Sequence, residues 1–248
     1  MTVLIAQISD IHAARGAASL AALDRALDYL SAQKPDAIIV SGDVSNKPHA
    51  EGYPLARQAL AAAWCPVFMV PGNVDDRDAM RAAFPDATYW PPEGPLHVNE
   101  VVAGAVRVVG LDVTVPGETY GEVTTDCLDF LATALDSEPS VPALVFMHQH
   151  PFPLHSSRLD KNMCRNVEPL SDVLRASRAK VLGVVCGHAH RAASGMLGPV
   201  PARMSPPLVT SNPALVEGHA APPVTDPPGL LLHAIEGDSL VTHTISLG

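Results

Sequence analysis

The sequence is short of basic residues, long apolar runs and closely spaced cysteines, and each shortage excludes a class of protein. Lys and Arg number 16 against 26 Asp and Glu, for a formal net charge of −10, which argues against binding a nucleic-acid backbone through a broad basic face. No apolar run reaches the ~18 residues of a membrane span, and no basic signal-peptide head precedes the first apolar run. We therefore expect a cytoplasmic protein with no membrane attachment and no stable nucleic-acid complex.

Three common kinds of site are also missing. The four cysteines, Cys65, Cys127, Cys164 and Cys186, form no Cys-x-x-Cys pair, which argues against a thiolate zinc site. No Gly-x-Ser-x-Gly elbow and no Walker-type Gly-rich loop with Lys occurs. The chemistry of this protein must therefore come from other side chains.

Hydrophobic residues make up 47% of the 248-residue chain, whereas aromatic residues make up 4%. This composition indicates an ordinary globular protein, and the length suits one domain spanning 1–248. Short apolar runs alternate with amphipathic stretches, which is typical of an α/β fold with parallel strands. Buried strands are predicted at 3–8, 37–40, 67–70, 143–147 and 181–186, and helices at 19–32 (capped by Ser19), 51–63, 76–84, 126–135 and 169–176.

The remaining segments have other patterns. Residues 97–102 and 106–111 are predicted to form a hairpin around Ala103-Gly104. Residues 151–167 have weak periodicity directly after two histidines, so we expect a loop that overhangs the site. Residues 196–248 are rich in Pro and β-formers, and their runs at 208–211, 230–235 and 240–245 predict a mainly antiparallel second sheet, with a surface loop at 220–228.

Metal-capable side chains follow each of the five buried runs. In chain order the groups are Asp10-x-His12, Gly42-Asp43, Gly72-Asn73-x-Asp75, His148-x-His150 and Gly187-His188-x-His190. Any one of them has an ordinary explanation, because a lone Asp-x-His is more often a turn with a surface histidine. Parallel strands present their C-terminal ends at one edge, where open α/β sheets place ligands. The joint pattern therefore predicts a metal site at that edge.

This ordered set of motifs resembles the calcineurin-like metallophosphoesterases over nearly the whole chain. The resemblance implies a four-layer αββα sandwich, with two mixed sheets flanked by helices and a dinuclear metal site at the strand ends. Manganese, iron or zinc would suit such donors. Carried over by motif position, one metal would be bound by Asp10, His12, Asp43 and His190, and the other by Asp43, Asn73, His148 and His188, with Asp43 bridging.

The resemblance also implies a reaction. Two bound metals would share a hydroxide that attacks phosphorus in line. The segment His148 to Pro153 and the run Gly110-Leu111-Asp112 look like the branch that acts on cyclic nucleotides and glycerophosphodiesters. A small soluble phosphodiester is thus the expected partner, and a homo-oligomer stays open. Catalytic roles would fall to Asp43, Asn73 and His150, and substrate contacts to Asn73, His150 and His190. A loop histidine without a catalytic role is an equal interpretation of His150.

One position departs from the family pattern. The third motif usually contains a histidine that helps the leaving group, but this chain has Val74 there. His150 or His97 could take over that role, or the substrate could have a leaving group that needs less help. A metal-binding scaffold with weak activity is a third interpretation, and a phosphomonoesterase is the alternative enzyme. Asp75 keeps its position and is expected to support His12 or the motif loop.

Overall fold

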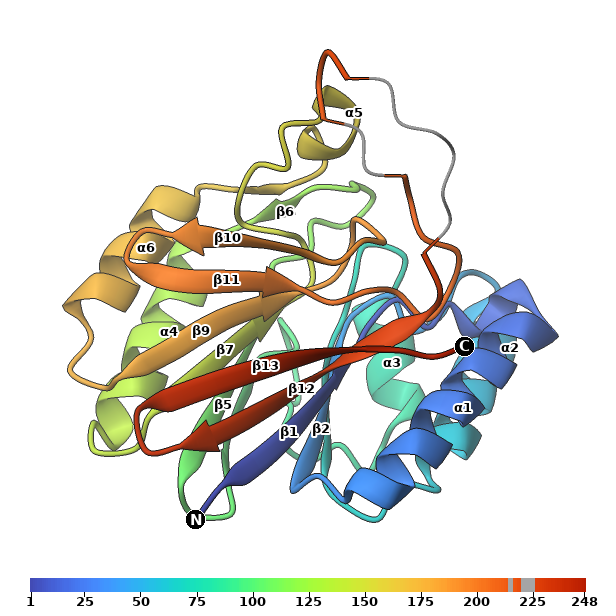
Figure 1. Ribbon diagram of the computed structural model, residues 1–248, viewed down its shortest axis with the longest axis horizontal. Helices are drawn as coiled ribbons and strands as arrows, with labels where there is room; N and C mark the ends of the chain where they lie inside the picture. Colours follow the sequence, from blue (N-terminus) through green and yellow to red (C-terminus); the bar gives the residue numbers. More distant parts are fainter. Residues whose placement is uncertain (214–215, 220–225) are drawn as a thin grey trace.

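Two β-sheets packed face to face form the centre of the protein (Figure 1). The computed structural model describes residues 1–213, 216–219 and 226–248. The first sheet contains, in spatial order, β13 (Ser239–Ser246), β12 (Gly229–Glu236), β1 (Val3–Ile8), β2 (Ala37–Ser41) and β3 (Val67–Val70). The second contains β10 (Ala193–Leu197), β11 (Val200–Met204), β9 (Val181–Cys186), β7 (Ala143–Met147), β5 (Val106–Leu111) and β4 (Val98–Val102).

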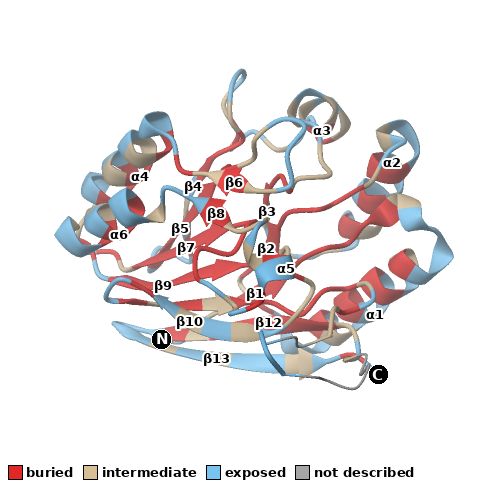
Figure 2. Cartoon of the chain, turned by 90° about the horizontal axis from the view of Figure 1, so that it is seen from above, coloured by how far each residue is buried: buried red, intermediate tan, exposed pale blue. Residues whose placement is uncertain are grey.

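Helices cover the outer face of each sheet (Figure 2). The first sheet is flanked by α1 (Ala17–Gln33), α2 (His49–Leu60) and α3 (Arg77–Ala83), and the second by α4 (Thr125–Ser137) and α6 (Val167–Ala176). Shorter elements are η1 (Ala13–Arg15), α5 (Ser157–Asp160) and the paired strands β6 (Gly121–Glu122) and β8 (Cys164–Arg165). The expected four-layer αββα sandwich with mixed sheets is therefore confirmed.

The core follows from the two-residue period of the strands. On β7, Leu144 and Phe146 point into the apolar layer between the sheets, whereas Val145 and Met147 pack under α4 and α6. Successive side chains of a strand face opposite sides, so a continuous apolar run is what a strand covered on both faces requires. This burial makes the strands rigid supports for the loops at their C-terminal ends.

Because the central strands of each sheet are parallel, the loops at their C-terminal ends lie at the same edge of the sheets. Within the first sheet, β1, β2 and β3 are parallel. Within the second, β5, β7 and β9 are parallel. Backbone hydrogen bonds connect the loops, from Asp10 N–H to Gly42 O (3.1 Å) and from Gly187 N–H to His148 O (3.0 Å). The second of these bonds joins the loops that follow β7 and β9.

Some sequence expectations differ from the structure at the C-terminal end. β12 and β13 form, but they extend the first sheet, with β12 antiparallel to β1, because the free edge of β1 needs a partner. Residues 208–211 form no strand, and neither β10 nor β11 was anticipated. The loop expected at 220–228 lies for its first six residues outside the described part of the chain.

Two further details were wrong or incomplete. Helix α1 begins at Ala17 with Gly16 as its N-cap, so Ser19 lies inside the helix, buried, and does not cap it. The segment 151–167 includes α5 and β8, and α5 projects above the sheets (Figure 1). Among the described residues, none of the helices has the length and hydropathy that crossing a bilayer would require.

Candidate metal centre

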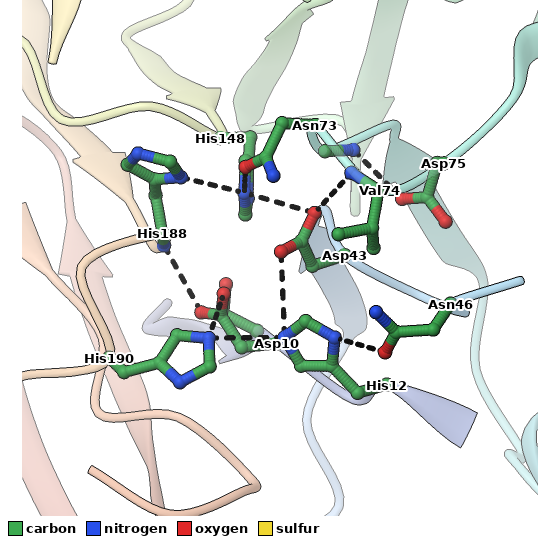
Figure 3. A network of polar contacts seen from close by, with 12 residues as sticks. Asp10, His12, Asp43, Asn46, Asn73, Val74, Asp75, His148, His188 and His190 are labelled. Atoms are coloured by element: carbon green, nitrogen blue, oxygen red, sulfur yellow. Dashed lines mark hydrogen bonds and ion pairs between the residues drawn. The ribbon is translucent and has the colours of Figure 1, made fainter. Parts of the chain in front are cut away.

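The seven residues predicted as metal ligands all lie together at the ends of the parallel strands (Figure 3). Asp10 and His12 follow β1, Asp43 follows β2 and Asn73 follows β3. From the other sheet, His148 follows β7, and His188 and His190 follow β9. Residues up to 180 positions apart in the chain therefore share one site.

The backbone at this site is held in an uncommon conformation. Positive φ angles occur at five of the seven residues, namely Asp10 (56°), His12 (50°), Asp43 (53°), His188 (79°) and His190 (51°). A left-handed conformation costs on the order of 1–3 kcal/mol for a residue other than glycine. Such strain persists where the surrounding structure imposes it, and it turns these side chains inward.

Two glycines allow the loops to approach closely. Gly42 has φ +91°, and a Cβ there would lie 2.5 Å from Nδ1 of His148. A Cβ on Gly72 would overlap the carboxylate of Asp43. Both positions therefore require glycine, because any side chain would displace a donor of the site.

A first group of donors is formed by Asp10, His12, Asp43 and His190, each of which has one ligand atom within 4.8 Å of the others. Nδ1 of His12 contacts Oδ1 of Asn46 at 2.7 Å, and Nδ1 of His190 contacts the Thr210 carbonyl at 3.2 Å. Since both partners accept hydrogen bonds, each Nδ1 donates and each Nε2 is turned toward the site.

The two Nε2 atoms lie 3.0 Å apart. Two lone pairs at this distance repel unless a proton or a cation lies between them. The carboxylate of Asp10 also needs a positive partner at this point. Its Oδ2 accepts the His188 backbone N–H at 3.1 Å, while its buried Oδ1 has no hydrogen-bond partner in the described structure and lies 3.3 Å from Nε2 of His190. This arrangement fits a divalent cation.

A second group of donors lies on the other side of Asp43. Nε2 of His148 is 3.2 Å from Oδ1 of Asp43, 3.3 Å from Oδ1 of Asn73 and 3.3 Å from Nδ1 of His188. The Ser41 carbonyl accepts a hydrogen bond from Nδ1 of His148 at 2.7 Å, which leaves Nε2 to face these donors. Oδ2 of Asp43 instead lies 3.4 Å from Nε2 of His12. The two oxygens of one carboxylate thus face the two groups.

The charges of the site depend on one another. Burial would raise the pKa of Asp43, but the nearby His148 lowers it overall. Burial would also raise the pKa of Asp10, but His190 lowers it overall. Burial opposes protonation of His148, yet Asp43 raises its pKa to about 9. Asp10 similarly raises the pKa of His190 against the effect of burial. These raised pKa values favour protons on the two imidazoles, and the positive charge of those protons would offset the buried carboxylates.

His188 behaves differently. Burial, reinforced by His148, lowers its pKa to about 3. A neutral imidazole is the form that binds a metal.

Asp75 organises the loops around the site. Its carboxylate accepts the backbone N–H groups of Val44 (3.0 Å), Ser45 (3.0 Å) and Gly72 (2.8 Å) and the hydroxyl of Tyr53 (3.1 Å). These bonds tie the loop after β2 to the loop after β3. Of the two roles expected for Asp75, the structure shows the loop contacts, while His12 is oriented by Asn46.

His150 and His97, the two histidines that could take the role of the histidine missing at position 74, lie in different parts of the structure. His150 is fully buried with its ring 5.6 Å from that of His188. Neither ring nitrogen has a hydrogen-bond partner in the described structure, and Nε2 lies 3.9 Å from Oδ1 of Asp160. Burial lowers its pKa to about 4. His97 stacks on Phe130 at 4.5 Å, and its Nδ1 accepts the Asp112 N–H at 3.0 Å. Val74 itself donates its backbone N–H to Asp43 at 3.1 Å.

Sequence reasoning missed the groups that orient the donors. Asn46 could have been recognised, because it follows Asp43 in the same loop. The carbonyls of Ser41 and Thr210 could not have been recognised, because a backbone acceptor does not depend on which side chain the residue carries.

An αββα sandwich with carboxylate, amide and imidazole donors at its strand ends defines a metal-dependent enzyme of the phosphoesterase class. The family model described as calcineurin-like phosphoesterase matches residues 3–192. The chain belongs to this family, as the motifs predicted.

Curated relatives cover most of the chain. This chain is 27% identical over 224 residues to the "Probable glycerophosphodiester phosphodiesterase GpdQ" of Arcobacter nitrofigilis, and the match covers 87% of this chain and 79% of that protein. It is 32% identical over 215 residues to the "3',5'-cyclic adenosine monophosphate phosphodiesterase CpdA" of Pseudomonas aeruginosa, covering 83% and 76%. Among solved structures, a dimetal phosphatase from Danio rerio has a TM-score of 0.69 at 14% identity, covering 99% of each chain. This likeness supports the fold alone.

Proposed function

We propose that this metal-dependent phosphoesterase holds two metal ions and hydrolyses a small soluble phosphodiester. The observation that carries the proposal is the orientation of Asp43, whose Oδ1 faces His148 at 3.2 Å and whose Oδ2 faces His12 at 3.4 Å. A carboxylate between two groups of donors is suited to bridging two cations. The donor types would accept manganese, iron or zinc.

The bound metals would supply an activated water nucleophile and neutralise charge on the phosphoryl oxygens. The residues of this chain would do the positioning. The Oδ1 of Asn73 is directed at His148, so its amide N–H groups remain to donate to a phosphoryl oxygen. The second-layer acceptors Asn46, Ser41 and Thr210 hold three imidazoles in one tautomer, which fixes the geometry of the donors.

The choice of a diester is supported by the relatives, whose names give a glycerophosphodiester and a cyclic nucleotide as substrates. Both are small anions, and a chain of net charge −10 would rely on bound cations to attract them. The four cysteines are free, which fits the reducing cytoplasm proposed for this protein. Roles for His150 and His190 in substrate contact remain part of the proposal.

Hydrolysis of bis(p-nitrophenyl) phosphate with added Mn²⁺ tests the proposal. Wild-type protein is expected to release nitrophenolate, and Asp43→Ala to lose this activity together with bound metal measured by elemental analysis. The exposed Asp24→Ala is the matched control and should retain both. Turnover unaffected by Asp43→Ala would contradict the mechanism. Faster hydrolysis of p-nitrophenyl phosphate than of the diester would instead favour a phosphomonoesterase.

A further inference from the structure

The metal centre takes its donors from two different sheets. Those from the first sheet are Asp10, His12, Asp43 and Asn73, and those from the second are His148, His188 and His190. The layer between the sheets is apolar, and apolar contacts are non-directional, whereas a hydrogen bond requires a definite distance and angle. A side chain with hydrogen bonds to both sheets close to the donors would therefore define the relative position of the sheets more sharply than packing does.

Gln7 is such a side chain. It is the one polar residue of β1 and is fully buried. Its Nε2 donates to Oγ of Ser41 at 2.8 Å, in the same sheet, and to the Cys186 carbonyl at 2.9 Å, in the facing sheet. Ser41 is the last residue of β2, and Cys186 is the last residue of β9. One amide group therefore joins the ends of two strands that belong to different sheets.

The amide of Gln7 has one orientation that satisfies its neighbours. The Cys186 carbonyl accepts hydrogen bonds and cannot donate them, so the amide atom that faces it is Nε2. Oε1 then accepts the N–H of His233 Nε2 at 3.2 Å, and Nδ1 of His233 accepts the Thr242 hydroxyl at 3.0 Å. Both N–H groups and the oxygen of the amide have partners, and a fully satisfied buried network rigidifies its surroundings.

The two residues that accept from Gln7 lie directly before donor loops. Asp43 comes two residues after Ser41, and His188 comes two residues after Cys186. A displacement of either strand end would therefore move a donor with it. Metal–ligand distances hold to within about 0.2 Å, so a small displacement is enough to weaken metal binding.

Other contacts connect the same strand ends. The Ser41 carbonyl accepts a hydrogen bond from Nδ1 of His148 at 2.7 Å, so Ser41 also orients a donor of the facing sheet. A Cβ on Gly187 would overlap the hydroxyl of Ser9, which places the loop after β9 directly against the end of β1. The strand ends that Gln7 joins are thus in contact with one another and with the donors.

We propose that Gln7 is a positioning residue that fixes the offset between the two sheets at the metal centre, so that donors from both sheets reach the same cation. It acts through Ser41 and Cys186. A methionine would fill a similar volume in this apolar layer without burying an amide, so packing alone does not account for a glutamine here. The inference rests on the part of the proposed function in which these donors bind metal, and it is independent of the ester that is hydrolysed.

Metal affinity measures this role. Gln7→Met keeps the size of the side chain and removes its hydrogen bonds, whereas Leu182→Ala removes apolar contacts from the same layer near the start of β9. Calorimetric titration with Zn²⁺ gives the affinity, and urea unfolding of the metal-free proteins gives the stability. We expect Gln7→Met to weaken Zn²⁺ binding about 10- to 100-fold, as loss of an orienting partner does. Leu182→Ala should change it less than about threefold even if it lowers stability more. Wild-type affinity in Gln7→Met, or equal losses in the two variants, would overturn the proposal.

Ser41→Ala gives a second test that does not depend on Gln7→Met folding. It removes one acceptor of Gln7 and leaves the carbonyl that orients His148 in place. We expect affinity to fall about fivefold, the equivalent of one hydrogen bond, and the double variant to bind no more weakly than Gln7→Met. Losses that multiply in the double variant, or no loss in Ser41→Ala, would contradict the route through Ser41.

The visible spectrum of the Co²⁺-loaded protein reports donor geometry, which a general loss of stability does not alter. At saturating Co²⁺, Gln7→Met should change the absorption bands, and Leu182→Ala should match the wild type. Identical spectra for all three proteins would show that Gln7 does not position the donors. None of these measurements uses turnover, so a wild type that binds metal and hydrolyses no diester would refute the proposed function alone.

Discussion

His12 and His190 place their Nε2 atoms 3.0 Å apart, although 178 residues separate them in the chain. Their opposite ring nitrogens contact Asn46 and the Thr210 carbonyl, so both Nε2 atoms are directed at the same point. Asp10, acting against burial, raises the pKa of His190, which favours a proton at that point when no metal is bound. A metal ion competes with that proton.

We therefore predict that metal uptake releases protons. The pKa of His148 is raised to about 9, so near neutral pH its imidazole carries a proton that bound metal would replace, about one per site, and the raised pKa of His190 acts in the same direction. Calorimetric titration with Zn²⁺ in buffers of different ionisation enthalpy measures this number, and affinity should weaken as pH falls. His148→Gln should release about one proton fewer, and an unchanged number would contradict this assignment.

A second prediction concerns Asp75. Asp75→Ala would leave the buried N–H groups of Val44, Ser45 and Gly72 without an acceptor, at a cost of about 3 kcal/mol or more in the free energy of unfolding. The loop that carries Asp43 would then loosen, and metal retention should fall. Urea unfolding and elemental analysis provide the measurements. Asp78→Ala is the control, because within the described residues its exposed side chain pairs with Arg81 alone, and equal stability of the two variants would count against the role of Asp75.

The third prediction concerns pH and His233, which is buried between Thr242 (3.0 Å) and Gln7 (3.2 Å). Burial, with a smaller contribution from Arg203, lowers its pKa from 6.5 to about 3. The unfolded chain therefore gains a proton below about pH 6.5 that the folded chain does not accept. Stability should be complete above that pH and fall at lower pH, by about 1.5 kcal/mol between pH 6.5 and 5 from this residue.

Chemical denaturation at several pH values checks this expectation. In His233→Gln the dependence of unfolding free energy on pH should be shallower by that amount, whatever the substitution costs at neutral pH. His243→Gln should keep the wild-type slope because His243 is exposed. Parallel curves for wild type and His233→Gln would show that His233 does not titrate in this way.

A fourth prediction addresses Val74. If the missing histidine limits the reaction, Val74→His should raise turnover of diesters with poor leaving groups more than that of nitrophenyl esters, by about 10-fold or more. The side chain is partly exposed at a cavity of about 430 Å³ beside the metal centre, so the substitution fits without disturbing the core. Steady-state kinetics on both substrates provide the comparison, with Val101→His on the exposed face of β4 as control. An equal gain on both substrates would rule out this explanation.

The strands and the donor set were predictable because each depends on local sequence. A run such as Ala143 to Met147 is apolar throughout, and parallel strands bring the loops at their C-terminal ends to one edge of the sheet. The helix start at Ser19 was mistaken because the helix begins after Gly16, which has no side chain to cap it and whose carbonyl accepts the Ser19 N–H at 3.2 Å. The position of β12 beside β1 could not be predicted from the sequence, because an apolar run does not specify the strand edge with which it will pair.

The sequence by itself determined that donors stand at the ends of five buried strands, because strand periodicity and motif spacing are local properties. Only the tertiary structure decided which ring nitrogens converge, that the two oxygens of Asp43 face different groups of donors, and that Gln7 joins the ends of β2 and β9. These features depend on backbone carbonyls, on left-handed turns and on the packing of two sheets, and none of those is specified by the identity of neighbouring residues in the chain.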